Sequence, residues 1–212
     1  YDDQYCSESV GGKMEIVVTN NQKYVDEIVN IHLKTFTGFF LTFLGKGFLK
    51  QLYKGFMEHE QSNLIIAIEN KKIVGFLAYS ENMSELYKYL IKNKLIQFAW
   101  YSFIAFLKKP TIFIRLISAF GKSEEVDRNE SYIELSSIGV LPDAKGKGIG
   151  SKMIDKLKEI VDFDEFDYIS LETDAKDNDY ANKFYQKNGF KLDRTYKTKQ
   201  GRIMNEYHYS KV

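Results

Sequence analysis

The sequence holds very little cysteine, proline or clustered histidine, and each shortage removes a class of protein. Cys6 is the only cysteine among 212 residues, so no disulfide can form within the chain, as is typical of a reducing compartment. Only two prolines occur and no low-complexity tract is present, which argues against a disordered chain. His32, His59 and His208 lie far apart and in no metal-ligand spacing, so we predict no metal site.

A membrane-spanning segment and a strong charge imbalance are missing too. The longest uncharged apolar stretch, Leu95 to Leu107, is shorter than the about 20 residues that a transmembrane helix needs. The first residues are acidic and polar, unlike a secretory signal. The formal net charge is +1, so the chain as a whole is no binder of polyanions such as nucleic acids. We therefore expect a cytoplasmic protein.

The chain does hold enough apolar residues for one sizeable domain. They make up 44% of the sequence, which suffices for a full hydrophobic core. Residues 1–13 lack periodicity and precede Met14, which we take as the natural start. The residues before Met14 are then a tag or a disordered leader. No internal repeat or boundary follows, so residues 14–212 are predicted to form a single domain.

Hydrophobic periodicity predicts a mixed α/β fold. Strands are expected at residues 15–19, 64–69, 73–79, 131–141, 168–173, 190–196 and 204–209. Helices are expected at residues 23–36, 44–57, 84–120 with a break at Pro110, 148–161 and 179–187. This order is that of a mixed α/β layer fold, with a helical insert at about 81–130 between the third and fourth strands.

A glycine-rich loop stands between a predicted strand and an amphipathic helix. It reads Lys145-Gly146-Lys147-Gly148-Ile149-Gly150-Ser151. Glycine lets a ligand approach the backbone, and a helix N-terminus offers unpaired N–H groups with partial positive charge. The pattern therefore favours an anion such as a pyrophosphate. Its spacing fits neither a Walker loop nor the dinucleotide loop Gly-x-Gly-x-x-Gly, and a flexible strand-to-helix turn is the alternative interpretation.

A second motif makes the prediction from that loop more specific. It is Asn178-x-x-Ala181-x-x-Phe184-Tyr185-x-x-Asn188-Gly189-Phe190. Together, residues 135–190 resemble the GNAT acetyltransferase superfamily. The loop is similar to its Gln/Arg-x-x-Gly-x-Gly/Ala motif, with Lys145 at the position of the usual arginine or glutamine, and the strand from Ser136 to Pro142 looks like its splayed fourth strand. The resemblance implies a GNAT-like fold and acetyl-CoA as cosubstrate.

The resemblance also implies how the donor is held. Backbone N–H groups from Lys145 to Ser151 would bind the pyrophosphate of coenzyme A. The backbone of Ile138, Gly139 and Val140 would pair with the pantetheine arm like an added strand. Asn178 would hydrogen-bond the pantetheine or the adjacent backbone. These roles are what the resemblance implies for the matching positions.

The catalytic groups implied are a phenol and a carboxylate. Tyr185 would protonate the departing thiolate, and the backbone N–H of Val140 would stabilise the oxyanion. The alternative for Tyr185 is a half-buried structural tyrosine, since the chain has fifteen tyrosines. Glu134 is the candidate base: two-residue alternation places it on the same face as Ser136 and Ile138. A solvated strand glutamate is the alternative, with bulk water as the proton acceptor.

The insert before the fourth strand has an unusual composition. From Lys88 to Arg115 its charged residues are six cations and no anion, interleaved with aromatic and aliphatic residues. Three interpretations compete, and we favour extra core with a dimer surface. The second is a basic, aromatic cleft for an anionic acceptor such as a nucleotide-linked amino sugar, with Lys108, Lys109 and Arg115 as its cations. The third is an interfacial helix pair on anionic lipid.

We therefore predict a bacterial acetyltransferase that moves an acetyl group from acetyl-CoA to an amine of a small molecule. No cysteine nucleophile lies near the motifs, which favours direct transfer in a ternary complex. A resemblance of residues 39–53 to acetyltransferases of bacterial surface-sugar pathways favours the amino-sugar acceptor over the lipid interpretation. The rival function is a non-catalytic acyl-CoA-binding or scaffold module. A homodimer and peripheral membrane contact are both compatible with the insert.

Overall fold

The computed structural model describes residues 14–111, 130–198 and 201–211. The predicted tag or leader at 1–13, the predicted helix from residue 112 to 120 with Arg115, and the rest of the insert up to residue 129 lie outside this part of the chain. The strands are β1 (Glu15–Thr19), β2 (Ser62–Glu69), β3 (Lys72–Ser80), β4 (Tyr132–Val140), β5 (Tyr168–Asp174), β6 (Lys191–Lys197) and β7 (Ile203–Tyr209). The helices are α1 (Val25–Thr35), α2 (Phe40–Glu58), α3 (Met83–Lys108), α5 (Ile149–Ile160) and α6 (Asp179–Lys187), with 3-10 turns η1 (Gln22–Tyr24) and η2 (Pro142–Ala144).

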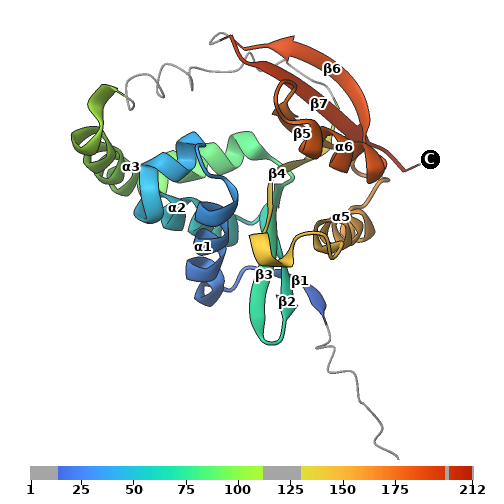
Figure 1. Cartoon of the computed structure of the whole chain (residues 1–212), viewed down its shortest axis with the longest axis horizontal. Helices are drawn as coiled ribbons and strands as arrows, with labels where there is room; N and C mark the ends of the chain where they lie inside the picture. The colour runs from blue at the N-terminus through green and yellow to red at the C-terminus, as the bar shows by residue number, and fades with distance from the viewer. Residues whose placement is uncertain (1–13, 112–129, 199–200, 212) are drawn as a thin grey trace, which may run out of the picture.

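All the strands named above join in one sheet, in the order β1-β2-β3-β4-β5-β7-β6. Among them, β4 and β5 are parallel and the other neighbouring pairs are antiparallel. Helices α1, α2 and α3 lie on one side of the sheet, and α5 and α6 lie on the other (Figure 1). The predicted mixed α/β fold, with a helical insertion between the third and fourth strands, is confirmed, because α3 occupies that place.

Each face of the sheet has its own apolar core. The stripe predicted on α5 packs against one face, with Ile149, Met153, Ile154 and Leu157 almost fully buried. The opposite face packs against α1 and α2. The central strands are covered on both sides, which is why β2 and β3 read as nearly continuous apolar runs rather than as alternating ones.

Helix α3 is held against α2 by two glycines of α2. A Cβ atom on Gly47 would collide with the ring of Tyr101, and one on Gly55 would collide with Leu90. These glycines are helical and permit close approach, whereas Gly45 interrupts α2 with φ 87° and ψ 177°. Helix α3 ends at Lys108, just before Pro110, as the proline predicts. Within the described ranges, no helix is both long and apolar enough to cross a bilayer.

Candidate active site

The sheet opens at its centre, between β4 and β5. Within the described residues, the two strands pair only where Tyr132–Glu134 meets Tyr168–Ser170. Strand β4 continues to Val140 and keeps its pairing with β3 on the other edge. From Leu135 onward, the edge of β4 that faces β5 therefore has no strand partner in this part of the chain. An open edge of this kind can receive an extended ligand, and the predicted donor-binding residues 138–140 lie on it.

An irregularity in the β3–β4 pairing adds one residue to β4. Tyr79 pairs with Leu135, whereas the preceding Ala78 pairs with Ser137. Ser136 is the extra residue, so β4 has a bulge at this point. The bulge shifts the alternation of side chains along the rest of the strand.

The bulge corrects the predicted orientation of Glu134. Strict alternation put Glu134 and Ile138 on one face, and this is wrong. Ile138 packs against the core on the α5 side. Glu134 pairs with Ser80, which is two residues from Ala78, and Ala78 belongs to the core on the α1–α2 side. The carboxylate is therefore on the α1–α2 side of the sheet.

The glycine loop leads directly into α5. Gly146 has φ 83° and Gly148 has φ 74°, the left-handed region that favours glycine. Gly148 is the N-cap of α5, no side chain caps the helix, and its first turn holds no acidic residue. The N–H groups of that turn lack helical partners, so the loop ends in a site with donors and partial positive charge. This geometry suits a phosphate group.

Gly150 has a different reason to be glycine. A Cβ atom there would lie 2.9 Å from Cζ of Phe184 on α6 and 3.8 Å from Cδ1 of Ile138 on β4. We expected all three glycines of the loop to clear space for a ligand. Gly150 instead lets α5 pack closely against α6. The loop, the second motif and β4 thus meet at one point.

The two loop lysines differ in their contacts. Nζ of Lys147 lies 3.2 Å from Oε2 of Glu69 on β2, and the lysine is half exposed. Lys145 is exposed. Exposed ion pairs are weak, so Lys147 can exchange its carboxylate for a phosphate at little cost.

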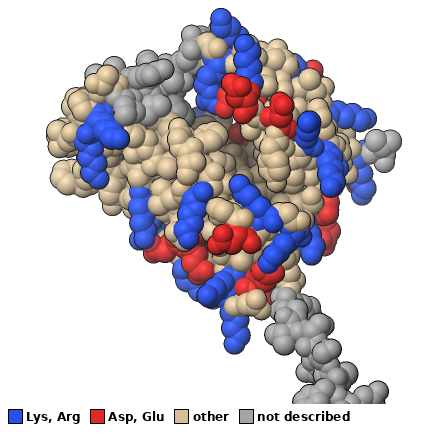
Figure 2. Space-filling view, in the orientation of Figure 1, with Lys and Arg blue, Asp and Glu red and all other residues tan. Residues whose placement is uncertain are grey.

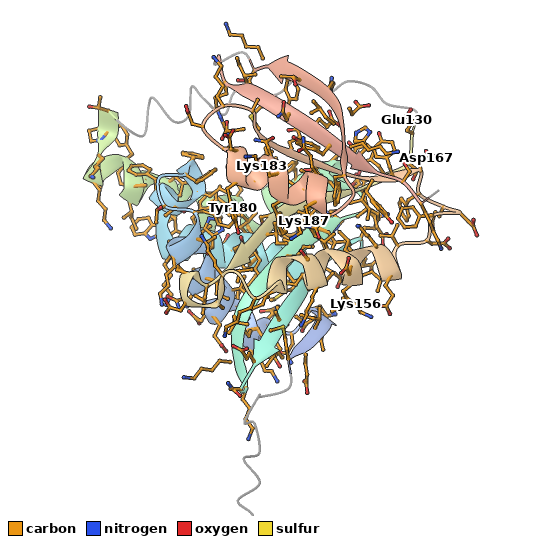
Figure 3. The ribbon with its side chains drawn as sticks, turned by 45° about the vertical axis from the view of Figure 1, so that its right-hand side comes forward. Glu130, Lys156, Asp167, Tyr180, Lys183 and Lys187 are labelled. Carbon is orange, nitrogen blue, oxygen red and sulfur yellow. The ribbon has the colours of Figure 1, made fainter. Side chains whose placement is uncertain are left out.

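Asn178 stands at the N-terminus of α6. Its Nδ2 donates a hydrogen bond of 2.7 Å to Oγ1 of Thr173 on β5, and its backbone oxygen accepts bonds from Asn182. Tyr180 and Lys183 lie on the exposed side of the helix (Figure 3). Asn178 is therefore fixed between β5 and α6, at the end of β5 where the sheet has opened.

Tyr185 lies on the buried side of α6. Only 9% of it is exposed, and its ring packs near those of Phe184, Phe190 and Tyr207. Burial raises the pKa of its phenol to about 12. Among the described residues, Nε2 of His32 is the only fully buried side-chain nitrogen or oxygen without a hydrogen-bond partner. The hydroxyl of Tyr185 is therefore not an enclosed atom without a partner. The phenol of Tyr185 is thus protonated at neutral pH, and its hydroxyl is not fully enclosed.

Most of the chain, residues 25–190, matches the sequence model of the acetyltransferase (GNAT) family. The chain belongs to the GNAT acetyltransferase family. Among curated protein sequences, none matches it. Its acetyltransferase membership agrees with the sequence motifs and with the opened sheet.

Solved GNAT structures share the fold at low identity. An acetyltransferase of Bacillus cereus ATCC 10987 is 15% identical, with 95% of this chain and 99% of that chain covered and a TM-score of 0.59. An N-acetyltransferase of Staphylococcus aureus Mu50 is 15% identical, with 93% and 98% covered and a TM-score of 0.58. Arabidopsis thaliana NAA60, solved with acetyl-CoA, is 12% identical, with 93% and 98% covered and a TM-score of 0.56.

This GNAT chain also buries a polar pair that the sequence pattern did not reveal. His32 on α1 is 3% exposed, and its Nδ1 lies 2.6 Å from the hydroxyl of Tyr53 on α2. The side chain of Ser137 on β4 is a further hydrogen-bonding partner of Tyr53 and opposes the rise that burial causes in the pKa of the phenol. Burial lowers the pKa of His32 to about 4, so the imidazole is neutral at pH 7. The only sequence signal was a histidine within an apolar helical stripe.

Aromatic rings cover β4 beside this polar pair. A Cβ atom on Gly139 would lie 2.9 Å from the ring of Phe76 and 3.3 Å from that of Phe36, so only glycine fits. Phe36 follows α1 directly, and Thr35 donates a hydrogen bond of 3.3 Å to the backbone oxygen of Val140. The C-terminal end of α1 is therefore anchored over the part of β4 that is predicted to bind the donor.

The described residues contain one cluster of three side chains of the kinds that bind metal ions. Atoms of Asp193, Glu206 and His208 lie within 4.8 Å of one another. Glu206 already accepts from Arg194 at 2.7 Å and from Ser170 at 3.2 Å. These contacts explain the group as an internal ion-pair network of the GNAT sheet.

Proposed function

We propose that this acetyltransferase moves the acetyl group of acetyl-CoA directly to an amine of a small-molecule acceptor, within a ternary complex. The observation that carries the proposal is the open edge of β4, set between the glycine loop and α6. NAA60, which shares the fold, was solved with acetyl-CoA, and this supports the choice of donor. Transfer to a cysteine first has no support, because Cys6 lies far from these motifs in sequence.

The donor is held by backbone groups in this proposal. The N–H groups from Lys145 to Ser151 bind the pyrophosphate, and Ile138, Gly139 and Val140 pair with the pantetheine arm along the open edge. The side-chain oxygen of Asn178 is available for a further hydrogen bond, since Nδ2 is used on Thr173. The supporting contacts are those of Gly150 with Ile138 on β4 and Phe184 on α6, and that of Asn178 with Thr173 on β5.

Three groups of the chain act on the reacting atoms. Glu134 takes a proton from the acceptor ammonium, directly or through water, so that a neutral amine can attack. The N–H of Val140 stabilises the negative charge that develops on the carbonyl oxygen. Tyr185 gives its proton to the departing thiolate. Positioning of the two substrates side by side adds several kcal/mol, on the general scale of about 7–11 kcal/mol for proximity effects.

The acceptor lies on the α1–α2 side of β4 in this proposal. Figure 2 shows the surface hollowed between these helices and the C-terminal strands, with acidic and basic side chains next to one another beside the hollow. Lys108 and Lys109 end α3 well away from β4 (Figure 1), and Arg115 lies outside the described residues. A nucleotide-linked amino sugar stays a candidate acceptor, without support from these two lysines.

Titration calorimetry with acetyl-CoA, followed by a thiol-release assay over an amine panel, tests the proposal. Binding together with amine-dependent thiol release is the expected result. Binding without thiol release across a broad panel would favour a non-catalytic acyl-CoA-binding module. Absence of binding would refute the donor assignment itself.

A further inference from the structure

The outward side of α3 collects most of the exposed apolar side chains. Of twelve large hydrophobic residues exposed in the described part of the chain, seven lie on this one helix. They are Tyr87, Ile91, Leu95, Ile96, Trp100, Phe103 and Leu107. Ile96 is 82% exposed and Trp100 is 60% exposed. Ile96, Trp100, Phe103 and Leu107 follow one another at spacings of four, three and four residues, so they lie on one side of the helix. Exposed apolar side chains gathered in this way mark an interaction site.

The inward side of α3 already supplies its attachment to the fold. Leu86 and Leu90 are buried against α2, and the buried Lys94 forms an ion pair of 2.6 Å with Glu58. Phe98 lies against Phe48 with ring centroids 4.5 Å apart. The exposed side chains are therefore not needed to hold the helix in place.

The second half of the helix forms an apolar patch with lysines at both ends. We define the patch as Leu95, Ile96, Trp100, Phe103 and Leu107, which spans about 18 Å at 1.5 Å per residue. The flanking cations are Lys92 before it and Lys108 and Lys109 after it, while Lys88, one turn earlier, is paired with Glu85 at 2.7 Å. No aspartate or glutamate occurs between residues 86 and 110.

This charge pattern selects among the possible occupants. A second copy packed patch to patch would bring lysines of one helix close to lysines of the other, since cations flank the patch at both ends. The one acidic residue of α3, Glu85 in its first turn, is already paired with Lys88, so it does not offset this repulsion. An anionic bilayer surface matches both features, because apolar side chains enter the headgroup region while lysine stems reach the phosphates.

We propose that α3 docks this protein on an anionic lipid bilayer, with the apolar patch in the interface and the three flanking lysines, Lys92, Lys108 and Lys109, at the headgroups. The helix lies along the surface, because it has an inward side fastened to α2 and lacks the apolar character of a spanning helix. Lysines near an anionic surface each add to the binding, and salt weakens their share. The proposal does not depend on acetyl transfer.

The single tryptophan of the chain offers a direct test, because Trp100 lies in the patch. Vesicles of equal parts phosphatidylglycerol and phosphatidylcholine should shift its emission to the blue, and raised salt should reduce the shift. Vesicles of phosphatidylcholine alone should give a much smaller shift. An equal response to both vesicle types, or no response, would overturn the proposal. A blue shift on raising protein concentration without lipid would assign the patch to a second copy instead.

Vesicle flotation of variants separates the contribution of the flanking lysines from that of the apolar side chains. Neutralising Lys108 and Lys109 with glutamine should lower the partition constant about thirtyfold at low salt. The Phe103→Ser variant should weaken binding to both vesicle types. The matched control is Leu192→Ser, because Leu192 lies on β6, outside the patch, and is 48% exposed. This variant should bind both vesicle types as the unmodified protein does. Unfolding midpoints should stay close to that of the unmodified protein, because the changed residues are exposed. Unchanged flotation of both patch variants would contradict the docking surface.

Discussion

Nδ1 of His32 lies 2.6 Å from the hydroxyl of Tyr53, and this buried bond ties α1 to α2 beside β4. Through Tyr53 the contact reaches Ser137, which lies in the stretch of β4 that pairs with β3 but not with β5. Nε2 of His32 has no hydrogen-bond partner, and it is the one such sealed side-chain atom in the described residues. An unpaired buried polar atom costs about 1–3 kcal/mol, so the pair specifies the position of the helices at some cost in stability.

The buried imidazole predicts how stability depends on pH. The pKa of His32 is lowered from 6.5 to about 4 by burial, so between these values the unfolded chain binds a proton that the folded chain does not. The contribution is complete above pH 6.5 and is lost as the pH falls toward 4. It amounts to about 3 kcal/mol, at about 1.4 kcal/mol for each pH unit. Urea unfolding at a series of pH values measures it.

The matched variant is His32→Gln, which keeps a hydrogen-bonding group but does not titrate. We expect it to be less stable than the unmodified protein at pH 7 and to lose less stability on acidification. If both proteins lose the same free energy of unfolding between pH 7 and pH 4.5, other groups cause the pH dependence.

Replacing Tyr185 with phenylalanine tests the proposed acid. The ring packing stays, so we expect unchanged acetyl-CoA affinity and a kcat lowered about a hundredfold. Tyr207→Phe is a matched control on β7, since its hydroxyl donates to Asn182 at 2.9 Å. That control should cost about 1 kcal/mol of stability and leave kcat nearly unchanged. Full activity of the Tyr185 variant would assign this residue to the core alone.

Glu134→Gln tests the proposed base with a side chain of the same shape. We expect kcat/KM to fall about a hundredfold near neutral pH. The defect should shrink at high pH, because more of the acceptor amine is then neutral without help. Glu172→Gln is the control, since Glu172 on β5 lies on the same face of the sheet as Glu134. A defect that is constant with pH would point to a structural role for Glu134.

Gly148→Ala tests the phosphate loop. At φ 74° alanine is strained by about 1–2 kcal/mol, and the strain moves the N–H groups that precede α5. We expect acetyl-CoA to bind about tenfold more weakly in calorimetry. Gly201→Ala, at φ 86° in the turn between β6 and β7, carries similar strain away from the loop. Equal effects of the two variants on donor affinity would argue against the loop as the binding site.

The element order and the position of the glycine loop at the start of α5 could be predicted from the sequence because their signals are local. The stripe on α5 repeats at helical spacing within a dozen residues, and the loop before it is contiguous. The C-cap signal at Asn188 and Gly189 likewise ends α6 where predicted. Periodicity and glycine placement act over one or two turns, so a single sequence carries them.

Other features depend on partners that are distant in sequence. The bulge at Ser136 is defined only by the register against β3, so alternation misplaced Glu134. The bond between His32 and Tyr53 joins two helices. In the same way, Gly150 is explained by Phe184 of another helix. The composition of α3 was visible in the sequence, but its exposed side became known only from its packing on α2.

The short pairing of β4 with β5 leaves a weak junction in the sheet, which we call the seam. The strands before it and those after it are each well connected by backbone hydrogen bonds, while the junction between them is narrow. Segments with few such bonds open at lower free energy than their surroundings, so amides along the seam should exchange with solvent early. A donor seated on β4 would close the seam, and the rigidity of the whole sheet would then follow the donor concentration.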